Sequence, residues 1–558
     1  MASPVRYSLA AAHAAARRLA GLAAAALVAC GGGAGDTPRA DAVEEDLAAD
    51  TAGPPAAAGV RGARDARTAR PGFIPTGDPN AQTQGVFGPV LDLPLMPIHQ
   101  VLLPDGRVLF YGSDVTGKQG ASLHYAVWDP SLGTGPAAFT VLPQVTGTNI
   151  FCAGQSLLPD TGDVLIVGGD TQVGKVNGWG VSDVNRFSTG ANRMIAEAPM
   201  AWRRWYPSLL TLTDGEQLAL GGRMDAPTSP VRGDTPATFA STPEAWSRGS
   251  GWRALTAANS DDAYGAASHA WYYPRGWVAP SGDVFILTPA GHMYRLQTAG
   301  AGALSRYGKQ APAALDAFLQ SVMYRPGRIL SVRSQASTID VDINGAKPVV
   351  TALAPTSRVR HYGNGTLLAD GRVWLNGGSA VGNVLEGDWF VSEAWDPATG
   401  AWSDMATAAV PRLYHSSALL LPDATVITGG GGDPGPVTNL NAEIYYPAYL
   451  YLKDGSGTPA PRPVIAAAPD VLGWNQPFTV TVAGGAAISR MTLVRSGVVT
   501  HDFNQSQRFQ ELAFTQSGAT LKAKSPWKAA VAPPGYYLLF VFDTAGVPSV
   551  AKVLRIGT

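Results

Sequence analysis

Five side chains of this sequence could together hold a redox metal, although they are scattered along the chain. They are Cys152, in a Phe-Cys-Ala-Gly segment; Tyr206, before a proline; the adjacent Tyr414 and His415; and His501, which precedes an aspartate. Two imidazoles and a phenolate, with an exchangeable water, make the nitrogen and oxygen set that Cu(II) prefers. The residue types therefore predict a copper site.

The cysteine count bears on the role of Cys152. The 558-residue chain has two cysteines, Cys30 and Cys152. A lone thiol is most often a small buried hydrophobe. Here the N-terminal segment predicts export to an oxidising compartment, where a thiol without a disulfide partner is unusual. This context favours a role for Cys152 other than that of a free buried thiol or a disulfide partner.

Residues 1–30 are typical of a bacterial lipoprotein signal. Arginines precede an apolar run over residues 19–29, which is too short to span a bilayer as a helix. The run ends in Leu-Val-Ala-Cys, which resembles a lipobox cleaved before Cys30 and lipidated on its sulfur. An ordinary secretory signal cut nearby is the alternative. Both predict export, and the first predicts a cell-envelope lipoprotein that contacts the membrane through its N-terminal lipid only.

Composition limits the classes of partner and fold. The formal net charge of -1 gives no electrostatic reason to expect nucleic acid as a partner. Residues 31–84 are rich in Ala, Gly, Pro and Asp and cannot bury enough apolar surface to fold, so they predict a disordered linker. The 65 glycines, 43 prolines and 14 tryptophans of the chain favour many short strands joined by turns.

A turn-and-strand pattern recurs seven times within residues 85–460. In most copies an apolar stretch runs into Asp-Gly or a similar turn, and a second apolar strand follows. Glycine in these turns accepts the positive φ that a tight hairpin demands. The spacing predicts four-stranded blades of a seven-bladed kelch-like β-propeller. The turns lie at residues 105–106, 161–162, 214–215, 281–282, 326–327, 370–371 and 423–424.

The period stops before residues 461–558. Residues 478–482 alternate between apolar and polar side chains, and residues 535–542 form a nearly continuous apolar run. Short strands of both kinds predict a C-terminal immunoglobulin-like β-sandwich. The whole chain is therefore expected to be all-β.

The propeller explains how the scattered residues could meet. Cys152, Tyr206 and Tyr414 each lie a few residues before the first strand of a blade, so all three are expected on one face. Tyr414 and His415 would point to opposite sides of a regular strand, so they can share a metal only from irregular backbone ahead of it. His501 can join them only if a loop of the sandwich enters the centre of the propeller.

Several motifs resemble those of one enzyme family. They are Arg-Leu-Tyr-His-Ser-Ser at 412–417, Thr-His at 500–501, Gln-Ser-Gln-Arg at 505–508 and Gly-Tyr-Tyr at 535–537. With Cys152 and Tyr206 before successive blades, the chain resembles the galactose oxidase and glyoxal oxidase family of copper-radical enzymes. The resemblance extends from the first blade to the end of the chain.

This resemblance implies an activity and a role for each residue. It implies a thioether cross-link between Cys152 and Tyr206, formed with copper and O2, that makes Tyr206 a radical cofactor. It implies that Tyr206, Tyr414, His415 and His501 bind Cu(2+), and that Tyr414 is the axial base. The expected reaction oxidises a small aldehyde, alcohol or carbohydrate with O2 and releases hydrogen peroxide. A monomer without an organic cofactor is expected.

The chain departs from the family around the substrate. A tryptophan that covers the thioether is absent after Gly222, where Arg223 and Met224 follow; Trp271, Tyr272 and Phe318 are candidate replacements. A sugar-binding arginine is also absent, since residues 307–312 read Tyr-Gly-Lys-Gln-Ala-Pro. These departures favour aldehyde hydrates or other primary alcohols over galactose, and leave the substrate-binding residues unknown.

Other interpretations remain open. His99, His124, His269, His292 and His361 are interpreted as structural, although His361 faces the same end of the propeller and is a candidate to line the pocket. A catalytically silent, surface-anchored scaffold or binding protein is the alternative function, because a fold alone does not establish catalysis. A propeller hydrolase is disfavoured, since paired carboxylates do not precede the blades.

Overall fold

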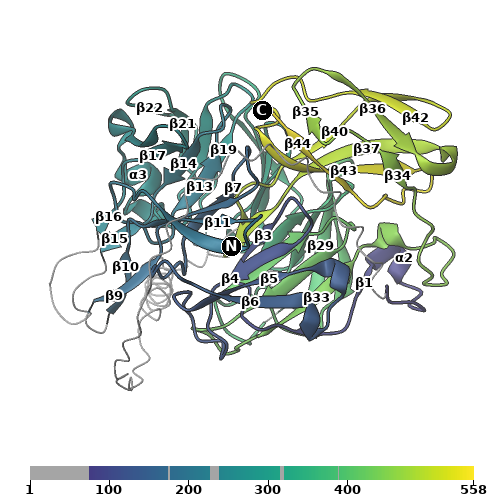
Figure 1. Ribbon diagram of the computed structural model, residues 1–558, viewed down its shortest axis with the longest axis horizontal. Helices are drawn as coiled ribbons and strands as arrows, with labels where there is room; N and C mark the ends of the chain where they lie inside the picture. Colours follow the sequence, from purple (N-terminus) through teal and green to yellow (C-terminus); the bar gives the residue numbers. More distant parts are fainter. Residues whose placement is uncertain (1–73, 174–175, 226–237, 315–319, 388, 558) are drawn as a thin grey trace, which may run out of the picture.

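The computed structural model describes residues 74–557, except 174–175, 226–237, 315–319 and 388. The predicted signal with Cys30, and residues 31–73 of the predicted linker, lie outside the described residues. The described chain is built almost entirely from β-strands, with two short α-helices, α2 (Ala81–Gln84) and α3 (Asp261–Tyr264) (Figure 1). Within this described part, no helix has the length and apolar character needed to cross a membrane.

Seven antiparallel sheets follow one another between residues 86 and 446 of the described chain. Most of their first strands contact the first strand of a neighbouring sheet, which places these strands around a common axis. Each sheet is called a blade here. The all-β architecture, with blades followed by a C-terminal sandwich, is confirmed.

The first four blades have four strands each from this part of the chain. The first blade contains β3 (His99–Leu102), β4 (Val108–Tyr111), β5 (His124–Trp128) and β6 (Phe139–Pro143), and the second contains β7 (Gly154–Leu157), β8 (Val164–Val167), β11 (Val184–Ser188) and β12 (Arg193–Glu197). The third contains β13 (Ser208–Thr211), β14 (Gln217–Leu220), β17 (Glu244–Ser247) and β18 (Gly251–Ala254), and the fourth contains β19 (Arg275–Val278), β20 (Val284–Leu287), β21 (Met293–Gln297) and β22 (Ala303–Arg306). Two hairpins are inserted in the second and third blades, namely β9 (Asp170–Val173) with β10 (Val176–Gly180), and β15 (Arg223–Asp225) with β16 (Thr238–Phe239).

The remaining blades consist of β23 (Ser321–Arg325), β24 (Arg328–Val332), β25 (Thr338–Asp342) and β26 (Val349–Leu353); β27 (Asn364–Leu367), β28 (Val373–Asn376), β29 (Val391–Asp396) and β30 (Ala401–Thr407); and β31 (Ser416–Leu420), β32 (Val426–Gly430) and β33 (Asn441–Tyr446) with β1 (Val86–Phe87) and β2 (Leu91–Asp92). Short 3-10 helices lie at Pro130–Leu132, Pro136–Ala138, Thr256–Ala258, Ala267–His269, Ser334–Ala336, Ala448–Leu450 and Ala483–Gly485.

Each recurrent turn joins the first and second strands of one blade. In the first blade, for example, Leu102 pairs with Val108 across the turn. Six of the turns place glycine at positive φ, with values from 69° to 101°. In the seventh turn Ala424 takes this conformation, with φ 67°. The local turn chemistry that the sequence shows is therefore what connects the inner strands of the blades.

The last blade is completed by residues from the start of the described chain. Strands β1 and β2 both pair with β33, so residues 86–92 close the ring of blades. The segment 74–84, which the sequence analysis assigned to the linker, packs here too. Gly77 N–H donates to Gly457 O at 3.1 Å, and Tyr451 Oη donates to Pro75 O at 3.1 Å.

Buried arginines anchor three of the loops that lead into the blades. Arg204, Arg360 and Arg412 pair with glutamates of the third strands at 2.9, 3.4 and 3.1 Å, and both partners are almost fully buried in every pair. Removing one partner of such a pair costs about 3–5 kcal/mol, because it leaves a charge buried alone. In all three loops a tyrosine follows two residues after the arginine. The Arg-x-Tyr pattern thus fixes where these tyrosines lie.

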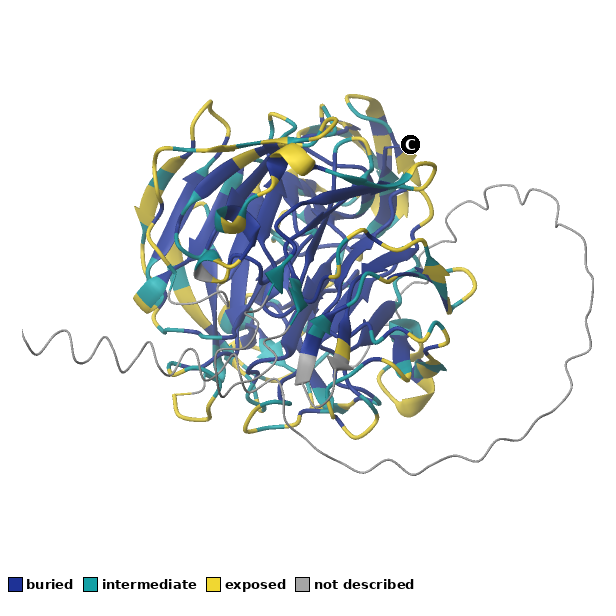
Figure 2. Ribbon diagram, turned by 90° about the vertical axis from the view of Figure 1, so that its left-hand side faces the viewer, coloured by how far each residue is buried: buried dark blue, intermediate teal, exposed yellow. Residues whose placement is uncertain are grey.

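The C-terminal domain is a sandwich of two sheets, seen at the upper right of Figure 1. One sheet contains β34 (Ile465–Ala467), β36 (Pro477–Val482), β42 (Thr520–Lys524) and β41 (Phe514–Ser517). The other contains β35 (Val471–Leu472), β44 (Lys552–Ile556), β43 (Gly535–Asp543), β37 (Ile488–Arg495) and β40 (Phe509–Glu511). Figure 2 shows buried strands throughout the molecule, with exposure concentrated in loops and edges.

The sandwich rests on the turns of the blades and sends one hairpin along the axis. Thr492 Oγ1 donates to Ala369 O at 2.9 Å, beside the turn of the sixth blade. Strands β38 (Val498–Thr500) and β39 (Phe503–Asn504) leave the sandwich, and β38 pairs with β3 of the first blade. Because Thr500 lies opposite His99, at the far end of β3 from its turn, the hairpin tip reaches the opposite face of the propeller.

Candidate metal centre

The loops that lead into the blades share an uncommon backbone conformation. Cys152, Tyr206, Tyr273 and Tyr362 each lie two residues before a first strand and have φ of 55°, 65°, 37° and 60°. His415, directly before β31, has φ 67°. Non-glycine residues rarely adopt positive φ. The structure therefore has the irregular backbone that Tyr414 and His415 need if both side chains are to face one site.

Main-chain hydrogen bonds hold the neighbouring loops together. Tyr206 N–H donates to Cys152 O at 2.9 Å, and Tyr273 N–H donates to Tyr206 O at 2.9 Å. Cys152 and Tyr206 also belong to the same buried apolar cluster. The two residues predicted to be cross-linked therefore lie side by side, on successive blades.

His501 enters from the sandwich at the tip of the β38–β39 hairpin. The turn has two residues, His501 and Asp502, with φ of 47° and 67°. Positive φ at both central residues is the pattern of a type I′ turn, which most often contains Asn-Gly. The hairpin thus carries His501 to the propeller axis, as the copper hypothesis requires.

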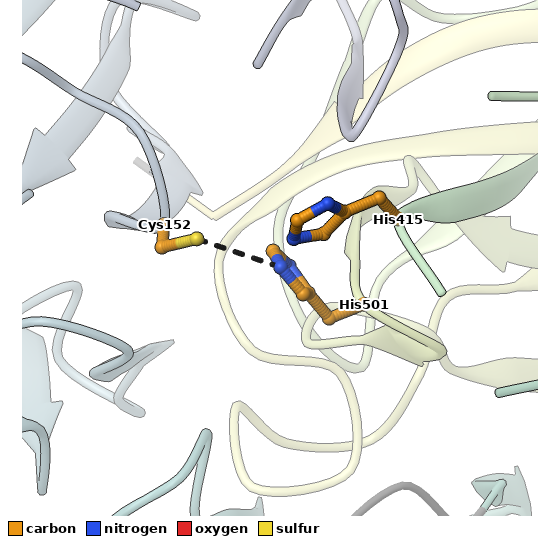
Figure 3. Close-up of side chains that lie close together, drawn as sticks. All are labelled: Cys152, His415 and His501. Atoms are coloured by element: carbon orange, nitrogen blue, oxygen red, sulfur yellow. Dashed lines mark hydrogen bonds between the residues drawn. The ribbon is translucent and has the colours of Figure 1, made fainter. Parts of the chain in front are cut away.

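The five predicted residues converge. The Tyr206 and Tyr414 hydroxyl oxygens are 2.6 Å apart. Figure 3 shows the Cys152 sulfur directed at His501, with Sγ 3.5 Å from Nε2, and His415 beside them. One ligand atom from each of these three residues lies within 4.8 Å of the others.

Each imidazole has a partner that orients it. His415 Nδ1 lies 2.8 Å from Gly432 O and 2.7 Å from Asp433 O, so this nitrogen carries the proton and donates it. His415 Nε2 is buried without a hydrogen-bond partner in the described part of the chain. His501 Nδ1 is 2.5 Å from Thr500 Oγ1. Partners of this kind fix the ring orientation of metal-binding histidines.

Burial keeps both histidines neutral. It lowers the pKa of His415 to about 4, although its two carbonyl partners act in the opposite direction. Burial also lowers the pKa of His501 well below the ordinary value, and the neighbouring His415 adds to this effect. Neutral imidazoles have a free nitrogen lone pair at neutral pH. Two such nitrogens beside two phenol oxygens fit the ligand preference of Cu(II).

Several aromatic rings surround Tyr206. Trp205 and Tyr272 have ring centroids 4.1 and 4.5 Å from that of Tyr206, whereas Trp271 is 6.0 Å away. The Arg223 guanidinium lies 4.2 Å above the Trp205 ring. Among the candidate replacements for the missing tryptophan, Tyr272 is thus nearer than Trp271. The third candidate, Phe318, lies outside the described residues.

A shallow recess, without room for a water molecule in this structure, lies beside the converging residues. Its lining residues are Tyr362, Tyr414, His415, Ser416, His501 and Asp502. His361, the predicted candidate for this wall, is absent from the lining, which its neighbour Tyr362 joins instead. Asp502 was likewise not among the predicted site residues. The Arg-x-Tyr pattern at 360–362, shared with 204–206 and 412–414, is the signal that could have identified Tyr362.

One of the other histidines is much closer to the centre than expected. His99 is fully buried, stacks on Tyr111 with centroids 4.4 Å apart, and lies 5.6 Å from the His501 ring. Burial lowers the pKa of His99 well below its ordinary value. His99 is therefore a neutral neighbour of the site rather than a distant strand residue.

Comparisons with known proteins relate most of the chain to oxidases. Residues 462–556 match the family described as galactose oxidase-like, Early set domain. A galactose oxidase of Gibberella zeae is 28% identical over 506 residues, covering 85% of this chain and 70% of the relative. The aldehyde oxidase GLOX1 of Arabidopsis thaliana is 24% identical over 527 residues, covering 83% of this chain and 80% of the relative.

A solved structure has the same fold. It is described as a novel fungal alcohol oxidase with catalytic diversity among the AA5 family, in complex with copper. The TM-score is 0.73 at 23% identity, and the match covers 85% of this chain and 100% of the other. The similarity therefore extends over the blades as well as the C-terminal domain.

Proposed function

The chain is a homologue of the galactose oxidases and glyoxal oxidases, and from this premise we propose that it is an exported copper-radical oxidase. The proposed reaction converts an aldehyde, as its hydrate, or a primary alcohol and O2 into the oxidised product and hydrogen peroxide. One observation carries the proposal: the hydroxyls of Tyr206 and Tyr414 meet at 2.6 Å, beside Cys152, His415 and His501.

The metal ligands in this proposal are Tyr206, Tyr414, His415 and His501. Bound copper would supply a one-electron redox centre and a Lewis acid for the substrate oxygen. The unpartnered Nε2 of His415 and the neutral state of both imidazoles support this assignment.

The second redox centre in the proposal is Tyr206, cross-linked to Cys152. The substrate loses two electrons and two protons, which is what O2 gains when it becomes hydrogen peroxide. One metal accounts for one electron, so Tyr206 as a radical accounts for the other. Formation of the thioether joins sulfur to a ring carbon and releases the thiol hydrogen and a ring hydrogen to O2. The main-chain hydrogen bond between Tyr206 and Cys152 supports this pairing.

Tyr414 is the proposed base for the substrate hydroxyl. It lies in the wall of the recess and next to Tyr206 Oη, so a hydroxyl bound there would be within reach of its oxygen. His415 and His501 are proposed as metal ligands and take no part in the proposed proton transfer. The recess is also lined by Tyr362, whose hydroxyl could accept or donate a hydrogen bond to a polar substrate.

We further infer that small aldehydes or primary alcohols are better substrates than galactose. The support is the sequence at 222–224 and 307–312, where the tryptophan and arginine expected of a galactose-specific enzyme are absent. Export as a lipoprotein lipidated on Cys30 is proposed from the Leu-Val-Ala-Cys segment.

Peroxide release tests the proposed function. Copper-loaded protein is supplied with aldehydes, primary alcohols and galactose in air, and hydrogen peroxide is measured. The Tyr206→Phe variant is the matched control, because it retains the ring but cannot form the phenoxyl radical. Peroxide from the wild type alone is the expected result. Silence of the wild type on the whole panel would favour the alternative function, a catalytically silent scaffold.

A further inference from the structure

A buried ion pair ties the tip of the β38–β39 hairpin to the fourth blade. Asp502 Oδ1 accepts a hydrogen bond from Arg275 Nη2 at 2.9 Å, and the side chains are 2% and 8% exposed. Arg275 is the first residue of β19, 227 positions before Asp502. Because Asp502 directly follows His501, this ion pair acts at the point where the hairpin presents its histidine.

Arg275 also contacts the loop before the fourth blade, which is hydrogen-bonded to Tyr206. Arg275 Nη1 donates to Tyr273 O at 2.8 Å, and Tyr273 N–H donates to Tyr206 O at 2.9 Å. The Arg275 guanidinium also lies 4.4 Å from the ring of Phe503, the residue after Asp502. Arg275 therefore connects the hairpin that carries His501 with the loop that carries Tyr206.

We propose that the Arg275–Asp502 ion pair is a positioning device that sets the place of His501 relative to Tyr206. The proposal rests on the proposed function for the identity of the metal, copper. Arg275 and Asp502 are positioning residues, since they act through His501 and Tyr206 and are not themselves ligands. The ion pair also couples the C-terminal domain to the propeller beside the centre, to which both contribute.

The hairpin needs such a tie because its own turn is poorly suited to hold it. Both residues of the turn are in the left-handed region, and neither is glycine. Histidine and aspartate adopt this conformation more often than most residues do, but they lack the freedom that glycine has there. Strands β38 and β39 are short, and metal-binding geometry must be held to within about 0.5 Å. A charge-assisted bond from the tip to a rigid strand compensates for the unfavourable turn.

Two variants separate positioning from stability. Asp502→Asn keeps the shape of the side chain and tolerates positive φ, but removes the charge. The double variant Asp502→Gly/Arg275→Met leaves no charge buried alone, and its glycine suits the turn better than aspartate. The single variant Arg275→Met is less suitable than Asp502→Asn: both leave one charge of the pair buried without its counter-ion, but the asparagine can still accept the hydrogen bond from Arg275 whereas methionine donates none.

Copper affinity, measured by competition with a chelator, and the Cu(II) EPR spectrum are the main readouts. We expect the double variant to lose about 10–100-fold in affinity, the size typical of losing an outer partner of a metal ligand, and Asp502→Asn to lose less. The EPR spectrum and the yield of the Cys152–Tyr206 cross-link should change in parallel. Arg186→Met is the control, since it breaks a 2.6 Å ion pair with Asp163 on the second blade. It should lower stability without altering the copper spectrum.

A second readout needs no metal. In copper-free protein, amide hydrogen exchange over residues 498–504 should be faster in Asp502→Asn and the double variant than in the wild type. Wild-type affinity, spectrum and exchange in both variants would overturn the proposal. If the wild-type protein binds no copper at all, the proposed function fails, and the exchange measurement alone decides whether the ion pair holds the hairpin.

Discussion

The side-chain oxygens of Tyr206 and Tyr414 lie 2.6 Å apart, although 208 positions separate the two residues. Each tyrosine follows a fully buried arginine by two positions, Arg204 or Arg412, and each arginine is paired with a glutamate of its own blade. The meeting of the two phenols is therefore built into the scaffold of the blades. It does not depend on flexible loops.

Removing the Tyr414 hydroxyl should abolish most of the turnover. If Tyr414 takes the substrate proton, Tyr414→Phe loses a base whose contribution is typically about 10²–10⁴-fold, and kcat/KM for peroxide release should fall by that factor. The Cys152–Tyr206 cross-link should still form. Tyr449→Phe is the matched control, since Tyr449 is a buried tyrosine that donates to Ala424 O at 2.6 Å. Substantial activity in Tyr414→Phe would exclude Tyr414 as the base.

Exposure to copper and air should join Cys152 to Tyr206. Digestion should then yield one branched peptide, lighter by two hydrogen atoms than the sum of its parts, which mass spectrometry detects. Cys152→Ala should remove the branch and the oxidase activity but leave copper bound, because the proposed ligands remain. A Cys152 thiol that alkylating reagents still modify in the unfolded, copper-treated protein would contradict the radical mechanism.

Copper affinity should depend on His415 and His501 but not on the nearby His99. His415→Ala and His501→Ala each remove a proposed ligand, so copper affinity should fall by more than the roughly 10–100-fold that follows loss of an outer partner. His99→Phe changes a buried histidine whose ring is 5.6 Å from that of His501 and should leave the affinity nearly unchanged. Isothermal titration of the three variants compares them directly. Equal losses in all three would show that the site was misassigned.

The buried carboxyl of Asp170 predicts a pH-dependent stability. Burial raises the pKa of Asp170 to about 7, although Gly178 N–H donates to Oδ1 at 2.7 Å. Because the folded-state pKa lies above that of the unfolded chain, the native state binds more protons between these values. The stabilising contribution is complete below about pH 4 and is lost as pH rises through about 7.

Asp170→Asn should remove this dependence. Above about pH 7 the variant should be more stable than the wild type by up to about 4 kcal/mol, and the difference should vanish near pH 4. Urea unfolding at several pH values measures both proteins. The same difference in stability at every pH would show that Asp170 is not the group responsible.

The fold could be predicted because its signals are local. The composition of the turns at Gly106 and its counterparts predicts their positive φ, and the strands on either side are apolar. The position of His501 was harder to predict, since a His-Asp turn lacks the usual hairpin composition. Its assignment came from the Thr-His motif at 500–501 and the Gln-Ser-Gln-Arg motif at 505–508, which resemble those of the oxidase family.

Other site residues could not be predicted because their partners are distant in the sequence. Arg275 and Asp502 have no local pattern that relates them, and their ion pair exists only once two domains have docked. Tyr273 and Tyr362 have positive φ through the packing of their loops, which no propensity of tyrosine foretells. Arg360, two residues before Tyr362, is visible in the sequence, but it indicates a loop of the site only when the three Arg-x-Tyr segments at 204–206, 360–362 and 412–414 are compared.

The hairpin that brings His501 to the axis also imposes an order on the maturation of the protein. Domains generally fold as units in order from the N-terminal end, and in an exported chain this order applies as the chain emerges from the membrane. All seven blades precede residues 498–504, so a growing chain can complete its propeller and still lack one of the two imidazoles of the centre. A nascent or truncated chain cannot assemble the full ligand set. In the proposed oxidase, radical chemistry would thereby be postponed until the last domain has docked.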